Sequence, residues 1–87
     1  MNEEVRSVIV KAGLNPDEFA VEMVYRDKKG KRTRRTISPT KVEDGQDKFG
    51  AMCLCREELR TFCFENVEEA KLVRSHEVLA PVAIIEL

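Results

Sequence analysis

The hydrophobic period of this chain changes once, and that change most constrains its fold. Four apolar residues recur at the three- and four-residue spacing of a single helical face: Val5, Val8, Ile9 and Ala12. Asn2 is a candidate N-cap, and Gly13 is a typical stop signal for this helix. From Phe19 onward, apolar and polar residues alternate, which is the period of a half-buried strand. The sequence therefore predicts one amino-terminal helix followed by strands.

Turn residues divide the rest of the chain into short strands. Phe19 to Arg26 and Lys31 to Ile37 are predicted to form a hairpin around a turn in which Gly30 takes a positive φ, and Pro39 is predicted to end it. Three further strands are predicted at residues 49–55, 60–64 and 78–87, the last interrupted at Pro81. Their connections are predicted to be a polar turn at 44–47, a tight loop at 56–59 and a capping-box helix at 66–73. This order is typical of one mainly β domain: residues 1–18 form the helix and its exit turn, and residues 19–87 form a small β-barrel.

Charge is segregated along the chain although the formal net charge is only −1. Between Arg26 and Lys41 there are eight basic residues and one acid, Asp27, whereas the remaining residues hold seven basic and fifteen acidic side chains. This excess of basic charge on a hairpin favours a phosphate-binding surface. The alternative is a solvated hairpin edge whose charges prevent strand-to-strand aggregation.

The sequence gives little support to an enzyme, a metal site or a cofactor. Cys53, Cys55 and Cys63 could hold zinc only with a fourth ligand, so we expect them to pack as small apolar side chains. The single histidine, His76, follows Ser75 in a polar connector and is expected to be exposed rather than catalytic. No segment is apolar over the length that a membrane span requires, and the acidic, polar start is not typical of a signal peptide, so the cytoplasm is expected.

Several segments within residues 19–73 carry motifs in a fixed order: Val21–Asp27, Lys29–Lys31, Arg35–Pro39, Lys48–Cys53 and Arg56–Val67. Together they resemble WYL domains, in which a hairpin leads into an Arg-x-x-x-Pro signature, the Trp-Tyr-Leu triplet and an Arg-x-x-Leu-Arg-Thr-Phe segment. The resemblance implies an Sm- or SH3-like barrel that senses a ligand or binds nucleic acid. WYL domains usually follow a winged-helix DNA-binding domain in bacterial transcription regulators. Eighteen residues cannot hold such a domain, so this one is expected to stand alone.

The sequence departs from the WYL pattern at two places. Lys48, Phe49 and Gly50 stand where the triplet is expected, and Cys63 and Asn66 replace two arginines of the later motif. Arg35 and Arg60 occupy matching positions. A family ligand that requires the full set of arginines is therefore not expected to bind here.

The residues predicted to bind a phosphate-bearing ligand are Arg32, Arg34, Arg35, Lys48 and Arg60. Tyr25 and Phe49 could stack on bases, but a chain with few aromatic residues needs them inside, so each is expected more in the core than on a stacking surface. Arg35 and Arg60 fall on otherwise apolar strand faces. Such residues either line a pocket rim or pair with a carboxylate, the candidates being Glu22, Glu58 and Glu65.

Two functions remain open from the sequence. In the first, the barrel is a non-catalytic regulatory module that binds a nucleic acid or a nucleotide. In the second, it is a protein-interaction or oligomerisation module. The apolar segment at 80–87 and the segregated charges then let the chain dock with another copy of itself or with a separate regulatory protein, with the basic hairpin of one against the acidic face of the other.

Overall fold

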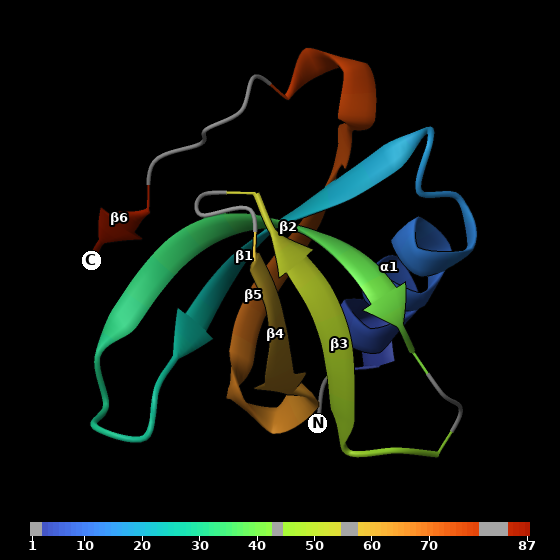
Figure 1. Ribbon diagram of the computed structural model, residues 1–87. Coiled ribbons are helices and arrows are strands. Elements are labelled where there is room, and N and C mark those ends of the chain that lie inside the picture. Colours follow the sequence, from blue (N-terminus) through green and yellow to red (C-terminus); the bar gives the residue numbers. More distant parts are fainter. Residues whose placement is uncertain (1–2, 43–44, 55–57, 79–83) are drawn as a thin grey trace.

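The computed structural model describes residues 3–42, 45–54, 58–78 and 84–87, which form a helix against an antiparallel sheet (Figure 1). In chain order the elements are α1 (Glu3–Leu14), β1 (Phe19–Arg26), β2 (Arg32–Lys41), β3 (Lys48–Cys53), β4 (Glu58–Cys63), β5 (Val67–Arg74) and β6 (Ile85–Glu86). Short 3-10 turns at Phe64–Asn66 and Ser75–Glu77 follow β4 and β5. In these described ranges no helix has the length and apolar character needed to cross a lipid bilayer.

The predicted helix is confirmed, although it runs past the predicted stop at Gly13 and ends at Leu14. Its first turn carries Glu3 and Glu4 at the positive end of the helix dipole. The predicted stripe faces inward, with Val5, Ile9 and Ala12 buried. The chain leaves the helix in the predicted turn, where the N–H of Phe19 donates to the carbonyl of Asn15 at 2.9 Å. Asn2, the predicted cap, lies outside the described residues.

The sheet is open rather than closed. Its strands lie in the order β4-β3-β2-β1-β5, and β6 pairs with β2. The mainly β class with one amino-terminal helix is confirmed, but the described strands include no pairing of β4 with β5 that would close a barrel. The sheet is strongly curved, and α1 lies away from the hairpin turn between β1 and β2 (Figure 1). One end of the inner face is therefore left without a helix over it.

The core lies between α1 and the inner face of the sheet. Strand alternation places Val21 and Met23 of β1 beside Ile37 of β2 and Phe49 and Ala51 of β3. All five are at most 1% exposed, and they pack with the buried face of α1. Burying large apolar side chains contributes about 1.5–3 kcal/mol each, so this cluster supplies most of the driving force for folding.

Pro39 does not end β2, which corrects the sequence-based prediction. The β2 strand runs on to Lys41, with Pro39 buried and opposite Ala51 of β3. The ladder between β1 and β2 ends where Val21 faces Ile37. A proline beyond that point removes no N–H from the β1 ladder, and the pairing with β3 shifts register directly after it.

The predicted helix at 66–73 is wrong, because this segment is the strand β5. Its residues pair with β1 from Phe19 opposite Arg74 to Tyr25 opposite Val67, with a register shift between Val24 and Tyr25. The capping-box pattern is a local signal. Without β5, the backbone N–H and C=O groups along one edge of β1 would lack partners inside a compact domain. The free-energy cost of leaving them unpaired exceeds the small stability of a short helix.

The remaining boundaries differ by a few residues. β4 begins at Glu58 instead of Arg60, and Phe64 belongs to a 3-10 turn instead of the strand. Gly30 and Gly45 take the positive φ expected of turn glycines, 83° and 77°. Of the predicted last strand, the structure describes Val78 and residues 84–87, and among these Ile85 and Glu86 form β6. Pro81 lies outside the described residues, as do Asp44, Cys55 and residues 56–57 of the tight loop.

Candidate functional site

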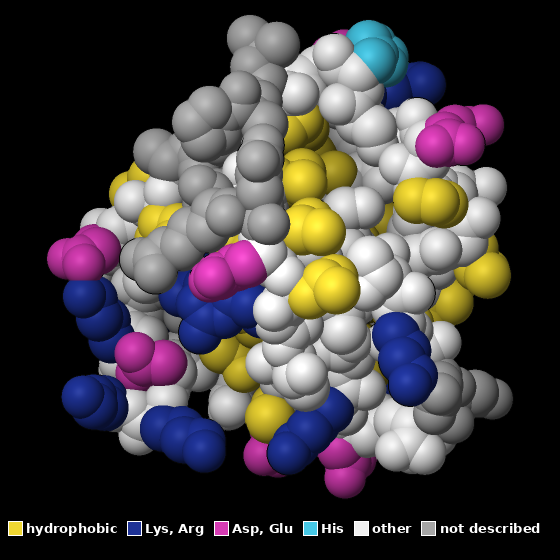
Figure 2. Space-filling model, viewed as in Figure 1, with side chains coloured by type: hydrophobic (Ala, Val, Ile, Leu, Met, Phe, Trp, Pro, Cys, Tyr) yellow, Lys and Arg dark blue, Asp and Glu magenta, His cyan; other side chains and the backbone are white. Residues whose placement is uncertain are grey.

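A pocket opens beside the hairpin turn of β1 and β2, with the edge strand β4 as its other wall. It has a volume of ≈ 490 Å³, within the usual range for small-ligand sites. Its basic lining residues are Lys28, Lys29, Arg35, Lys48 and Arg60. The other lining residues are Tyr25, Asp27, Thr61, Phe62, Cys63 and Asn66. We call this the basic pocket. Figure 2 shows lysine and arginine side chains gathered over the hairpin end of the sheet.

Arg35 is the central residue of the basic pocket. It points to the inner face of β2, because it lies two residues before the buried Ile37 and opposite the buried Met23. Its Nε donates a hydrogen bond to the Thr33 hydroxyl at 3.0 Å, and its Cζ lies 5.9 Å from the centre of the Phe62 ring. Its Nη1 is buried and has no hydrogen-bond partner among the described residues. A buried charged donor without an acceptor costs free energy that a bound anion would recover.

Two aromatic rings form the apolar wall of the basic pocket. Tyr25 and Phe62 meet edge to face, with ring centres 5.0 Å apart and an interplanar angle of 79°. The backbone N–H of Cys63 donates to the Tyr25 hydroxyl oxygen at 3.0 Å, which links β4 to β1. Because that oxygen acts as the acceptor, the hydroxyl proton can still be donated to a ligand.

The hairpin turn presents Lys28 and Lys29 from a well-defined backbone. The Asp27 carboxylate accepts the N–H groups of Lys29 and Lys31, at 2.8 and 2.9 Å. The backbone hydrogen bond from Lys31, followed by that from Lys29, holds the pKa of Asp27 below its ordinary value. Asp27 is therefore committed to the turn. The basic pocket holds five cations against this one acid.

Arg60 and Lys48 stand on the two strands at the β4 edge of the sheet. Arg60 lies on the inner face with Phe62, and its Nη1 is 4.0 Å from Glu58 in an exposed ion pair. Such a pair is worth little, about 0–1 kcal/mol, so it leaves Arg60 able to bind an anion. Lys48 is exposed at the start of β3, opposite Cys63. Arg60 thus takes both roles left open by the sequence, a pocket residue and a partner of Glu58.

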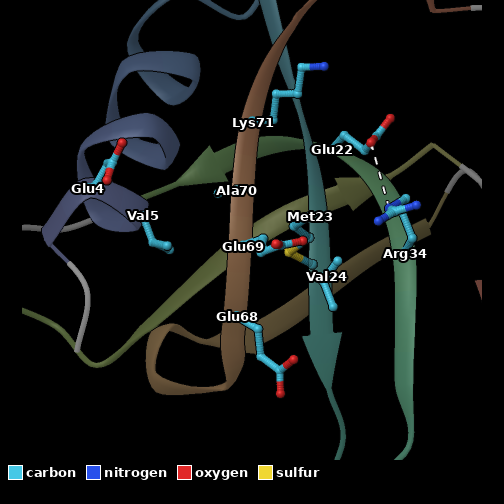
Figure 3. A pocket seen from close by; sticks show the side chains of 10 residues that line it. All are labelled: Glu4, Val5, Glu22, Met23, Val24, Arg34, Glu68, Glu69, Ala70 and Lys71. Atoms are coloured by element: carbon cyan, nitrogen blue, oxygen red, sulfur yellow. Dashed lines mark ion pairs between the residues drawn. The ribbon is translucent and has the colours of Figure 1, made fainter. Parts of the chain in front are cut away.

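Arg32 and Arg34, two of the predicted site residues, do not line the basic pocket. They alternate with Arg35 and lie on the outer face of β2. The Arg32 Nε lies 2.7 Å from Glu68, and the Arg34 Nε lies 3.8 Å from Glu22. Figure 3 shows Arg34 facing Glu22 in a second hollow of ≈ 420 Å³ that Glu4, Glu68 and Glu69 also line. Arg32 is therefore held by Glu68. The exposed pair of Arg34 with Glu22 is as weak as that of Arg60 with Glu58, so it is the strand face on which Arg34 lies that separates it from the basic pocket.

Phe49 is a core residue and not a stacking platform. It is 1% exposed, and its ring centre lies 4.6 Å from that of Phe64 and 5.7 Å from that of Phe62. The other candidate, Tyr25, is half-buried and lines the basic pocket, so it keeps a face for a ligand. Sequence reasoning missed Phe62, Lys28 and Lys29 as pocket residues. For the two lysines, the signal was their position in the basic run.

The two described cysteines do not gather metal ligands. Cys53 is buried in β3, and Cys63 is half-buried in the wall of the basic pocket. Within the described ranges, no group of three or more histidine, cysteine, aspartate or glutamate side chains lies close enough to hold a metal ion. His76 is exposed beside Glu77, with 3.9 Å between its Nε2 and the carboxylate.

Glu68 gives the outer face a pH-dependent contribution to stability. Hydrogen bonds from Arg32, and then from Arg26, lower the pKa of Glu68 below its ordinary value of 4.5. The ionised carboxylate therefore stabilises the folded chain at neutral pH, and this contribution is lost as the pH falls below 4.5 and through the lower folded pKa. We expect wild type to be more stable than Glu68→Gln at pH 7, with the difference vanishing at strongly acidic pH in urea unfolding. The exposed neighbour Glu65→Gln is the control, and a pH-independent difference for Glu68→Gln would contradict this account.

No protein-family model matches the sequence, and a search of curated proteins finds no significant match.

Proposed function

We propose that this chain is a non-catalytic binding module that holds a phosphate-bearing ligand, a nucleic acid or a nucleotide, in the basic pocket. The observation that carries the proposal is the buried Nη1 of Arg35, which lacks an acceptor among the described residues, in a pocket with four other cations. A phosphate oxygen is the acceptor that a guanidinium fits best, because the two can form paired, charge-assisted hydrogen bonds.

The five cations of the basic pocket come from three parts of the sheet. Lys28 and Lys29 come from the hairpin turn, Lys48 and Arg60 from β3 and β4, and Arg35 from the inner face of β2. Tyr25 beside this cluster offers a ring face and a hydroxyl donor to a base or sugar. The proposed ligand therefore has its phosphate on Arg35 and its base near Tyr25.

The resemblance to WYL domains supports the same site. Arg35 and Arg60, which occupy matching positions of the motifs, both line the basic pocket. Cys63 and Asn66, which replace two arginines of the motif, line it as well. We propose that the chain is a divergent Sm- or SH3-like module of this kind with a regulatory role. Its pocket carries two fewer arginines, and so it is suited to a ligand with fewer phosphate contacts.

Salt dependence of oligonucleotide binding tests the proposal. Fluorescence anisotropy with a short labelled oligothymidylate is expected to give an association constant that falls with a log–log salt slope of about −3.5 if all five pocket cations contact phosphates of a single strand. An Arg60→Met, Lys48→Met double variant should reduce the slope by about 1.4. Binding that does not change with salt, or no binding at low salt to either an oligonucleotide or a free nucleotide, would overturn the proposed function.

A further inference from the structure

The edge of β2 that faces β3 is divided between two strands. β3 pairs with it only from Ile37 to Lys41, and the N–H of Leu54 donates to Thr36 as the chain leaves the sheet. The first half of this edge is taken by β6, with Thr33 opposite Glu86 and Arg34 opposite Ile85. An unpaired stretch of strand edge readily accepts another strand. The start of β2 is therefore an acceptor edge that the chain fills with its own strand β6.

The contacts of β6 define which kind of segment this edge accepts. The N–H of Leu87 donates to the Arg32 carbonyl at 3.1 Å, and the Lys31 ammonium lies 2.5 Å from the Glu86 carboxylate. Ile85 and Leu87 flank the acid in the sequence, and strand alternation places them on the opposite face from it. An antiparallel strand with one acidic residue between two apolar ones therefore fits the edge. Residues 85–87 of this chain have that pattern.

Within a single copy, β6 is held by few interactions. It has two paired residues, and Ile85 and Leu87 remain 50% and 53% exposed. Exchange of such a segment between two copies keeps each backbone and ion-pair contact, because the acceptor edge and the strand are the same in both. It also brings two bodies together, which can cover the apolar surface that one copy leaves in water. We propose that the start of β2 is a dimer interface, filled by β6 of a second copy of this chain.

The proposed interface is separate from phosphate binding, because neither Lys31 nor Glu86 lines the basic pocket. It is also reciprocal: each copy donates one strand and accepts one, as a two-fold dimer requires. Each dimer therefore contains two Lys31–Glu86 pairs, and both join different copies. Reversing these charges therefore distinguishes β6 paired with β2 of the second copy from β6 paired with β2 of its own copy.

Two single variants, Lys31→Glu and Glu86→Lys, test the exchange. Each alone places like charges against each other in both pairs of its own dimer. In a one-to-one mixture, the reversed, acidic edge of the first variant meets the reversed, basic strand of the second, and the other pair is the native Lys31 with Glu86. Sedimentation equilibrium is expected to show wild-type dimers, and the mixture is expected to dimerise about tenfold more tightly than either variant alone, since two exposed ion pairs change sign.

Circular dichroism on each variant checks that it is folded, because both substitutions are on exposed side chains. Deletion of residues 84–87 should give a monomer that still binds the oligonucleotide probe. Mixing that leaves both variants monomeric, or wild type that stays monomeric at concentrations up to about 1 mM, would overturn the exchange. So would a dimer that persists after the deletion.

Discussion

Replacing Arg35 with methionine is expected to weaken oligonucleotide binding by about 10- to 100-fold, which is the loss of one or two hydrogen bonds to a charged group. The same change is expected to leave the free energy of unfolding unchanged or raise it by up to about 1 kcal/mol. Binding is thus expected to weaken at this residue without any loss of stability. Anisotropy titration and urea unfolding measure the two effects.

The physical reason lies in the environment of the guanidinium. Nη1 is buried without an acceptor among the described residues, so the folded chain carries the cost of desolvating it. Methionine keeps the length and apolar stem of the side chain against Phe62 and removes that cost, although Thr33 loses the hydrogen bond that Nε gives it. A residue that the fold tolerates at a cost is a reasonable candidate for a ligand-binding role.

Arg34→Met is the matched control for Arg35→Met. Arg34 is the neighbour of Arg35 on the same strand, but it faces the acidic hollow and lies 3.8 Å from Glu22. Its replacement is expected to change binding by no more than about twofold, since only long-range charge is lost. Equal losses for the two variants would mean that β2 acts as a general polycation, and the basic pocket would lose its assignment.

Replacing Phe49 with alanine is expected to destabilise the chain by about 3–5 kcal/mol, the usual range for removing a buried aromatic side chain. A domain of this size has a total stability of about 4–13 kcal/mol, so the loss would range from about a quarter of the total to all of it. Phe49 is 1% exposed and contacts the rings of Phe62 and Phe64, which would be left around a cavity. Thermal unfolding by circular dichroism measures the loss.

Phe49→Leu separates the core role of Phe49 from a stacking role. Leucine keeps most of the volume and is expected to cost no more than about 1.5 kcal/mol while leaving oligonucleotide affinity nearly unchanged. Tyr25→Leu, which removes the ring that does line the basic pocket, should weaken binding by about tenfold, because one base–aromatic contact is lost. A loss of affinity in Phe49→Leu that matches the loss in Tyr25→Leu would contradict the assignment of Phe49 to the core.

The sequence predicted the elements whose signals are local and periodic. The helical stripe from Val5 to Ala12 and the hairpin around Gly30 have the expected form, since spacing and turn chemistry determine them. The strand at Val67 could not be read in the same way. Its charged residues and capping pattern favour a helix, and only the need of β1 for a second pairing partner makes it a strand.

Strand alternation in the sequence predicted part of the candidate site. Alternation correctly placed Arg35 and Arg60 on apolar faces, and both line the basic pocket. The same alternation put Arg32 and Arg34 on the opposite face, but a count of basic residues along the hairpin does not separate the two faces. The carboxylates with which they pair, Glu68 and Glu22, come from β5 and β1. Sequence proximity does not reveal the long-range partner Glu68.

Nuclear magnetic resonance of the arginine side chains tests the central claim most directly. In a titration of the ¹⁵N-labelled chain with oligothymidylate, the Nε–H resonance of Arg35 is expected to shift and Arg60 to follow, while Arg32 and Arg34 remain nearly unchanged. The Arg35→Met variant identifies the Arg35 signal. Shifts confined to Arg35, Arg60 and the backbone around Lys29 and Cys63 would place the ligand in the basic pocket. Shifts centred on Arg32 and Arg34, with Arg35 unmoved, would contradict it.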